Sequence, residues 1–163
     1  MKTIIVYYSL EGNTEYVVNA IAGKLSTDVL KLVPKKAYSD KGFSKFFWGG
    51  KSAVMAETPE LEPYNVDLSG YDQVVIGFPV WAGTFTPPIR TFVKDNKAAL
   101  SGKRISAFAC QSGAGAEKAF AKLRDFIGID EFFTNIILID PKAKPSEQND
   151  LTIDTFCKKL QNE

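Results

Sequence analysis

Hydrophobic residues in this chain fall in short runs that alternate with stretches of helical spacing. Five runs are rich in apolar residues and end at turn-forming residues, which is typical of strands buried inside a parallel sheet. They cover residues 3–8, 28–33, 74–78, 105–110 and 136–139. Between them, apolar residues recur every three or four positions, as on the buried face of an amphipathic helix. The pattern therefore predicts strands that alternate with helices.

Helices are expected around residues 17–25 and over 88–100, 116–127 and 146–160. Pro88 suits the first turn of a helix, and Gly128 suits the position just after one. Alternation of this kind implies right-handed crossovers and helices on both faces of a parallel sheet. For 163 residues, the expected fold is one α/β domain over 1–163, with three α/β/α layers, doubly wound, and strand order 2-1-3-4-5.

Residues 35–65 interrupt this alternation as an extended loop or an extra helix between the second and third strands. Residues 35–51 hold five lysines and one aspartate, together with Phe43, Phe46, Phe47 and Trp48. One interpretation is a docking surface for an acidic partner, or a lid. The other, which we favour for the aromatic residues, is a helix that buries them on the sheet edge. The lysines would still steer an acidic partner.

Composition removes several classes of chemistry. The chain has no histidine, which excludes Ser-His-Asp and Cys-His catalysis and most transition-metal sites. Lys and Arg total 20 against 19 Asp and Glu, a net charge of +1 that argues against a nucleic-acid binder. No apolar run approaches the about 18 residues of a membrane span. Cys110 and Cys157 form no CxxC pair, so a reducing cytoplasm and buried thiols are expected. A bound cofactor is the natural source of chemistry.

The first of three candidate loops follows the first strand and runs from Ser9 to Thr14. It offers hydroxyls, a glycine, an amide side chain and the unpaired N–H groups of a helix start, which together favour an anion. The loop contains no Lys or Arg, so a phosphate there would be held by neutral donors. The alternative is a simple helix cap by Asn13 or Ser9. The loop lacks the lysine of a P-loop and the GxGxxG of a dinucleotide site.

The second and third loops follow the third and fourth strands, at the same edge of the sheet. In the second loop, Trp81 lies between a proline and a glycine, where it would contact an aromatic ligand or else pack the loop onto the sheet. Gly83 would let the backbone approach a ring edge. In the third loop, Gly113 and Gly115 free backbone N–H groups, although for this loop taken alone a tight strand–helix turn is the favoured explanation.

These three loops together resemble those of flavodoxins, over nearly the whole chain. Ser9-Leu10-Glu11-Gly12-Asn13-Thr14 is similar to the motif T/S-x-T/S-G-N-T and departs from it at Glu11, where a hydroxyl residue is usual. The second loop resembles a flavodoxin-like subgroup with a PxWxG loop followed by prolines. The turn at residues 112–115 fits the same subgroup, and the absence of a long insertion in the fifth strand indicates the short-chain type.

The resemblance implies that FMN is the cofactor, and no metal site is expected because the chain has no histidine. Its phosphate would be held by Ser9, Gly12, Asn13 and Thr14. Around the ring the expected residues are Pro79, Val80, Trp81, Ala82, Gly83, Gln111, Ser112, Gly113 and Gly115, with Glu11, Cys110 and Ala114 also at the site. Ala82 or Gly83 would turn a carbonyl toward flavin N5.

By the same resemblance, the expected function is a low-potential electron carrier between a reductase and an acceptor protein, as a monomer or weak dimer. The alternative is an FMN-dependent NAD(P)H:quinone-type oxidoreductase, which the missing aromatic residue in the third loop and the long 35–65 segment favour. A phosphate-binding response-regulator-like domain is the weakest interpretation, because the first and third strands end without aspartates.

Overall fold

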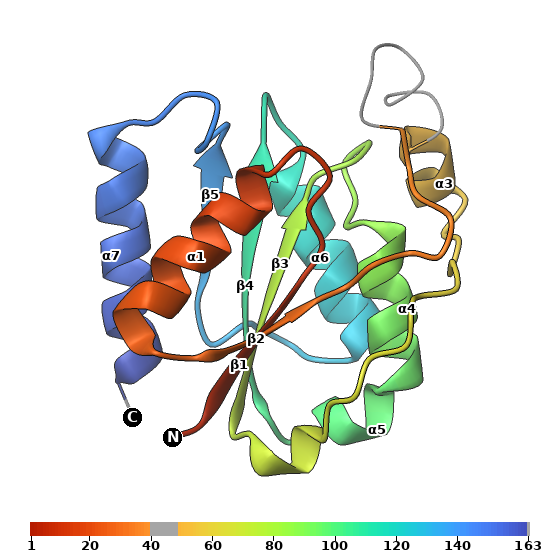
Figure 1. The fold of residues 1–163 in the computed structure, drawn as a ribbon, viewed down its shortest axis with the longest axis horizontal. Coiled ribbons are helices and arrows are strands. Elements are labelled where there is room, and N and C mark those ends of the chain that lie inside the picture. The colour runs from red at the N-terminus through yellow and green to blue at the C-terminus, as the bar shows by residue number, and fades with distance from the viewer. Residues whose placement is uncertain (40–48, 163) are drawn as a thin grey trace.

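The computed structural model describes residues 1–39 and 49–162, which form a five-stranded parallel sheet flanked by helices (Figure 1). The strands are β1 (Thr3–Tyr7), β2 (Asp28–Lys31), β3 (Gln73–Pro79), β4 (Arg104–Gln111) and β5 (Asn135–Ile139). Their order is β2-β1-β3-β4-β5, and every neighbouring pair is parallel. The predicted fold class is confirmed.

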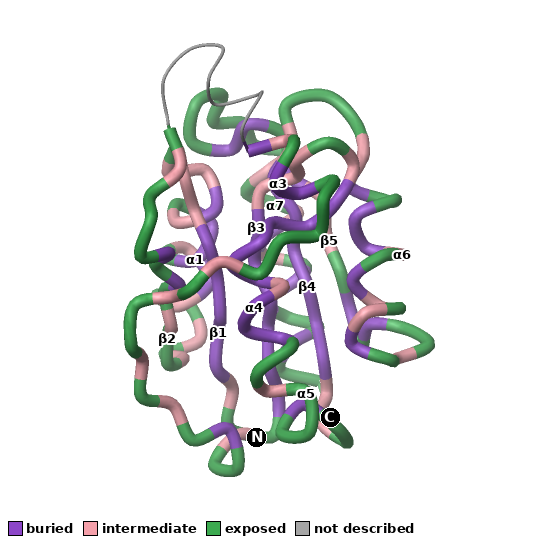
Figure 2. Tube along the Cα trace, turned by 90° about the vertical axis from the view of Figure 1, so that its right-hand side faces the viewer, coloured by how far each residue is buried: buried purple, intermediate pink, exposed green. Residues whose placement is uncertain are grey.

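Helices cover both faces of the sheet, because strand residues alternate between two separate cores. On one face, α1 (Asn13–Leu25) and α7 (Glu147–Gln161) bury residues such as Ile21 and Phe156. The other face is covered by α4 (Pro87–Asp95) and α6 (Ala116–Ile127), with Phe92 and Leu123 in its core. Figure 2 shows the buried residues concentrated along the central strands.

Two predicted elements differ from the structure. The expected helix over 88–100 is two helices, α4 and α5 (Lys97–Leu100), which meet at Asn96. The Asn96 Nδ2 donates to the hydroxyl of Tyr64 and to the carbonyl of Phe92, so a contact from a distant loop fixes the break. The second strand is shorter than expected, because the chain leaves the sheet edge after Lys31.

The segment between β2 and β3 contains two short helices in its described part, α3 (Gly50–Val54) and the 3₁₀ helix η2 (Leu68–Gly70). Tyr38 packs against the main core, and its hydroxyl is hydrogen-bonded to Ser52. The described part of the segment thus contains a short helix, α3, which includes none of the four aromatic residues. Phe43, Phe46, Phe47 and Trp48 lie outside the described residues, as do Lys41 and Lys45, and both interpretations of their role stay predictions.

The two cysteines are buried free thiols, Cys110 in β4 and Cys157 in α7, as expected. Within residues 1–39 and 49–162, no cluster of Cys, Asp or Glu side chains is suited to a metal ion. None of the described helices has the length and apolar character that crossing a membrane requires.

Candidate functional site

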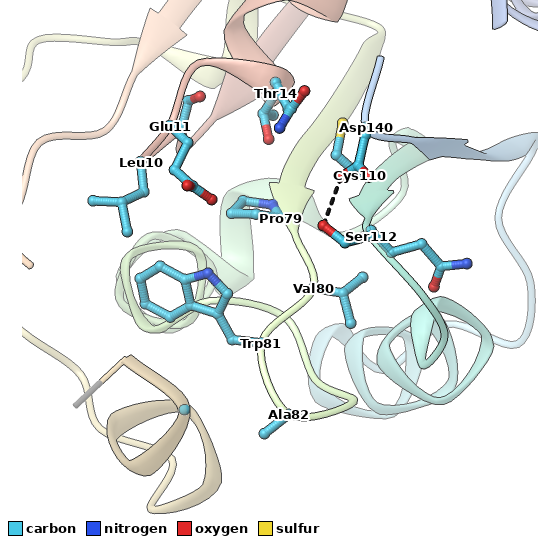
Figure 3. Close-up of a pocket in the computed structure, with 14 residues that line it drawn as sticks. Leu10, Glu11, Thr14, Pro79, Val80, Trp81, Ala82, Cys110, Ser112 and Asp140 are labelled. Atoms are coloured by element: carbon cyan, nitrogen blue, oxygen red, sulfur yellow. Dashed lines mark hydrogen bonds between the residues drawn. The ribbon is translucent and has the colours of Figure 1, made fainter. Parts of the chain in front are cut away.

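A cleft of about 200 Å³ lies at the carboxyl ends of the strands, where the strand order reverses between β1 and β3. Its walls come from the first, second and third loops, together with the ends of α3 and β5. The lining residues are Ser9, Leu10, Glu11, Asn13, Thr14, Gly50, Pro79, Val80, Trp81, Ala82, Cys110, Gln111, Ser112 and Asp140. Figure 3 shows Thr14, Cys110 and Asp140 toward one end of the cleft and Trp81 toward the other.

The structure thus brings most of the predicted site residues to one place. Gly12, Gly83, Gly113, Ala114 and Gly115 do not line the cleft themselves. Three of these glycines have positive φ angles, 93° at Gly12, 67° at Gly83 and 111° at Gly115. Since L side chains rarely adopt this conformation, these glycines shape the loops that carry the lining residues. Leu10, Gly50 and Asp140 line the cleft without having been predicted.

The first loop ends in the N-terminus of α1, with Gly12 in the N-cap position. Neither Ser9 nor Asn13 is the cap residue, but Ser9 Oγ accepts a hydrogen bond from the N–H of Glu15 at 3.2 Å. The hydroxyl of Thr14 is buried and makes no well-formed hydrogen bond among the described residues, although it lies close enough to the Cys110 thiol to lower the pKa of that group. A buried hydroxyl without a partner is unfavourable unless a ligand supplies one.

A fourth loop, between β5 and α7, also reaches the start of α1. Asn13 Oδ1 accepts hydrogen bonds from the N–H of Lys142 at 2.9 Å and, less closely, of Ala143 at 3.4 Å. The Lys142 side chain lies over Gly12, since a Cβ placed there would be 2.7 Å from Lys142 Nζ. Folding thus brings a lysine from far along the chain to a loop that contains no Lys or Arg of its own, and the expectation that neutral donors hold the phosphate stays a prediction.

Asp140 directly follows β5 and turns its carboxylate toward the third loop. Ser112 Oγ donates to Asp140 Oδ1 at 2.6 Å, and Lys144 Nζ lies 2.9 Å from Asp140 Oδ2. These hydrogen bonds, with that of Ser112 first, hold the pKa of Asp140 below its ordinary value. The cleft therefore contains a carboxylate at neutral pH. Asp140 could have been found from the sequence, because it follows a predicted strand whose carboxyl end lies at the same edge of the sheet as the three predicted loops.

The second loop closes with a two-residue turn. Trp81 and Thr84 exchange backbone hydrogen bonds of 3.1 and 3.0 Å across Ala82 and Gly83, both of which have positive φ angles. Val80 is tied to the third loop, because its N–H donates to the carbonyl of Cys110 at 2.9 Å. The turn is thus held by hydrogen bonds at both of its ends, while the peptide groups of Ala82 and Gly83 take no part in these bonds.

Trp81 belongs to an aromatic cluster at the edge of the cleft. Its ring packs edge-on against Tyr8 and Tyr38, with centroid distances of 5.7 and 5.1 Å. Gly49 approaches the same ring so closely that an added Cβ would lie 3.3 Å from it. Trp81 therefore packs its loop onto the protein and also lines the cleft, and its contact with an aromatic ligand stays a prediction.

The third loop leads from β4 into α6 and contacts the second loop. Gln111 Oε1 accepts a hydrogen bond from the N–H of Ala116 at 2.9 Å, and Gly115 is the N-cap residue. A Cβ on Gly115 would lie 3.0 Å from Gly83 Cα. Burial raises the pKa of the Cys110 thiol to about 12, so this residue is a thiol rather than a reactive thiolate.

Comparisons with known proteins agree with this architecture. A family model described as flavodoxin matches residues 2–143. A flavoprotein from Lactobacillus acidophilus, solved in complex with FMN, is 21% identical with a TM-score of 0.69, covering 86% of this chain and 94% of that one. A provisionally named flavoprotein from Bacteroides uniformis is 23% identical with a TM-score of 0.75, covering 96% and 97%. Flavodoxin 1 from Bacillus cereus is 16% identical with a TM-score of 0.57, covering 98% and 97%.

Proposed function

The chain belongs to the flavodoxin family, and on this premise we propose that it binds FMN in the cleft and carries low-potential electrons between redox proteins. The observation that carries the proposal is the unpartnered, buried hydroxyl of Thr14 at the start of α1, beside three loops that converge on one cleft. The phosphate would lie at this end. The flavin ring would lie toward Trp81.

The phosphate end has the donors that such a group requires. The first N–H groups of α1 have no partner within the helix, and the helix dipole favours an anion there. Ser9 accepts a hydrogen bond through Oγ, which leaves its own hydroxyl hydrogen to donate. Thr14 supplies the second hydroxyl, and Gly12 lets the backbone turn close to the ligand. Ser9, Gly12, Asn13 and Thr14 therefore fit the phosphate.

The ring end offers backbone groups and one aromatic side chain. No hydrogen bond involves the peptide groups of Ala82 and Gly83 in the described part of the chain, so both are available to the edge of the ring. Pro79, Val80 and Trp81 form the adjoining wall. Ser112 donates its hydroxyl hydrogen to Asp140, which leaves its oxygen as an acceptor for the ligand. Glu11, Cys110 and Gln111 complete the lining.

Bound FMN supplies the redox chemistry, and the protein binds, orients and shields it. Aromatic packing around Trp81 holds one wall of the cleft rigid. The carbonyl of Ala82 or Gly83 would accept a hydrogen bond from N5 of the flavin. Cys110 is too well buried to take part as a thiolate. The chain itself thus provides positioning and hydrogen bonds, with no side chain assigned to proton transfer.

The proposed partners are a reductase that loads the electrons and an acceptor protein that receives them. The proposed compartment is the cytoplasm. Cys110 and Cys157 support a reducing compartment, because both are buried free thiols and do not form a disulfide with each other.

A second candidate is an FMN-dependent NAD(P)H:quinone-type oxidoreductase on the same fold. The observation that favours it is the third loop, where residues 111–115 include no aromatic side chain to cover the flavin. Steady oxidation of NADPH with a quinone, without any added protein, would select this candidate. A requirement for a separate reductase would select the carrier.

Titration of the flavin-free protein with FMN tests the proposal. Flavin fluorescence should fall to a one-to-one end point, since a Trp and two Tyr rings lie at the ring end of the cleft. Thr14→Val should weaken this binding. A flavin-free protein that is folded by circular dichroism yet quenches no FMN fluorescence and retains none on gel filtration would contradict the proposal.

A further inference from the structure

Lys142 is an exposed lysine whose backbone is fixed against the phosphate end of the cleft. Its N–H donates to Asn13 Oδ1 at 2.9 Å, a contact between residues 129 positions apart. Its side chain then crosses Gly12, with Nζ at 2.7 Å and Cδ at 3.3 Å from the position of an added Cβ. The Lys142 ammonium therefore lies directly over the turn that opens α1.

The start of α1 is also the part of the cleft that lacks an internal partner for its polar groups. Thr14 is only 1% exposed and its hydroxyl makes no well-formed hydrogen bond among the described residues. Of the early N–H groups of α1, that of Glu15 is taken by Ser9, while those of Asn13 and Thr14 come too early for a bond within the helix. Lys142 does not itself line the cleft in this structure, but its side chain lies against Gly12, directly beside these groups.

Carboxylates near these groups would oppose a bound phosphate unless cations offset them. Glu15 is paired with Lys31 and Tyr7, and its pKa is lowered first by the Lys31 hydrogen bond, with Lys142 adding a smaller effect. Asp140 is paired with Lys144. Lys31 and Lys144 are thus already engaged with carboxylates. Lys142 Nζ forms no ion pair within residues 1–39 and 49–162, so its charge is available to a ligand.

We propose that Lys142 is a specificity-determining residue that pairs with the phosphate of FMN, so that this chain distinguishes FMN from riboflavin partly by charge. This inference rests on the proposed binding of FMN. It assigns this selectivity to the loop between β5 and α7, which lies outside the sequence motif at residues 9–14. Glu11 sits where the family motif has a hydroxyl residue, so the donors around the phosphate end differ from the motif at that position.

The test compares flavin affinities of the wild type with those of Lys142→Met, Lys142→Arg and Lys94→Met. Lys94 is the matched control, because it is an exposed lysine on α4 that lines a separate groove with residues of the 58–66 segment, whereas Lys142 lies against Gly12. Affinities for FMN and for riboflavin are measured by fluorescence quenching of the flavin-free proteins. An ion pair open to solvent supports an effect of about two- to fivefold on the FMN affinity of Lys142→Met.

The expected pattern has four parts. Lys142→Met weakens FMN binding and leaves riboflavin binding unchanged. Lys142→Arg keeps near-wild-type affinity, and Lys94→Met has no effect on either flavin. The difference in FMN affinity between the wild type and Lys142→Met shrinks in about 1 M salt, because the Debye length there is only about 3 Å.

Two results would overturn the assignment of Lys142. Equal FMN affinities of the wild type and Lys142→Met would show that the ammonium does not contact the phosphate. Equal losses for FMN and riboflavin would indicate a structural role for the loop. A wild-type protein that binds neither flavin would instead reject the proposed function itself, and the inference with it.

Discussion

Thr14 is the residue at which the free and the ligand-bound protein should differ most. Its hydroxyl is buried without a partner, and its side chain lines the cleft. Thr86 offers a comparison, because its hydroxyl is also buried without a partner but does not line the cleft. The two threonines separate the effect of an unpaired buried hydroxyl from the effect of a lost ligand contact.

Thr14→Val should therefore have opposite effects on stability and binding. Removing an unpartnered hydroxyl should leave the free energy of unfolding of the flavin-free protein equal or raise it by up to about 1 kcal/mol. Losing a hydrogen bond to a charged phosphate should weaken FMN binding by about tenfold or more. Urea denaturation and FMN titration measure the two effects. Thr86→Val should change the free energy of unfolding in the same direction without changing FMN affinity. If both variants weakened FMN binding equally, the role of Thr14 in binding would be rejected.

Gly115 holds the second and third loops together, because it combines a φ of 111° with a close approach to Gly83. Gly115→Ala should lower the free energy of unfolding by about 1–3 kcal/mol and weaken FMN binding. Gly23 is a matched control in α1, where an added Cβ meets nothing within 4 Å. Gly23→Ala should stabilise the protein by about 0.5–1 kcal/mol. If both variants were equally stable in urea, the loop contact would not constrain position 115.

At the scale of whole elements, the loop between β5 and α7 completes the site that the three predicted loops begin. It fixes Asp140 against Ser112 and sets Lys142 over Gly12. Asp140 adopts a φ of 42°, a conformation that Asn tolerates better than most residues. Asp140→Asn therefore removes the charge while keeping the turn.

The pKa of Asp140 is lower in the folded protein than its ordinary value of 3.8. The ionised side chain therefore stabilises the fold at pH values above 3.8. This stabilisation is lost as the pH falls through the pKa of the folded state. Asp140→Asn should therefore lower the free energy of unfolding by about 1 kcal/mol at pH 7. The difference from the wild type should shrink at pH 3. A difference that is the same at both pH values, measured by urea denaturation, would show that the charge of Asp140 does not stabilise the fold.

How far the elements can be predicted depends on whether their ends are set locally. The helix over 116–127 was predicted correctly at both ends, because Gly115 and Gly128 are local end signals with positive φ. The helix expected over 88–100 was wrong, because its break at Asn96 depends on a hydrogen bond to Tyr64 in a distant loop.

The site follows the same rule. Three loops were predictable because strand order places the carboxyl ends of β1, β3 and β4 together, and each loop carries its own glycines and hydroxyls. The fourth loop was missed, because Lys142 meets Asn13 only after folding. The cofactor contacts of all these residues stay predictions.

For the whole molecule, the near-neutral surface should set the redox potential. The net charge is +1, whereas flavodoxins of the kind that this chain resembles are usually strongly acidic. Less repulsion acts on the charge added to the bound flavin, so the potential for the second electron should be less negative than in an acidic flavodoxin. A redox titration of both proteins in one buffer measures this, and Lys35→Glu with Lys36→Glu should shift the potential downward. An equally low potential in the unmodified protein would count against the charge argument.

The central claim is that this chain is an FMN protein that transfers one electron at a time, and anaerobic photoreduction of the FMN-loaded protein tests it most directly. Absorbance is followed while the flavin is reduced. The account predicts a broad long-wavelength band from half-reduced flavin that accumulates to a large fraction before the spectrum bleaches. Direct bleaching without that band would contradict the carrier and select the two-electron oxidoreductase.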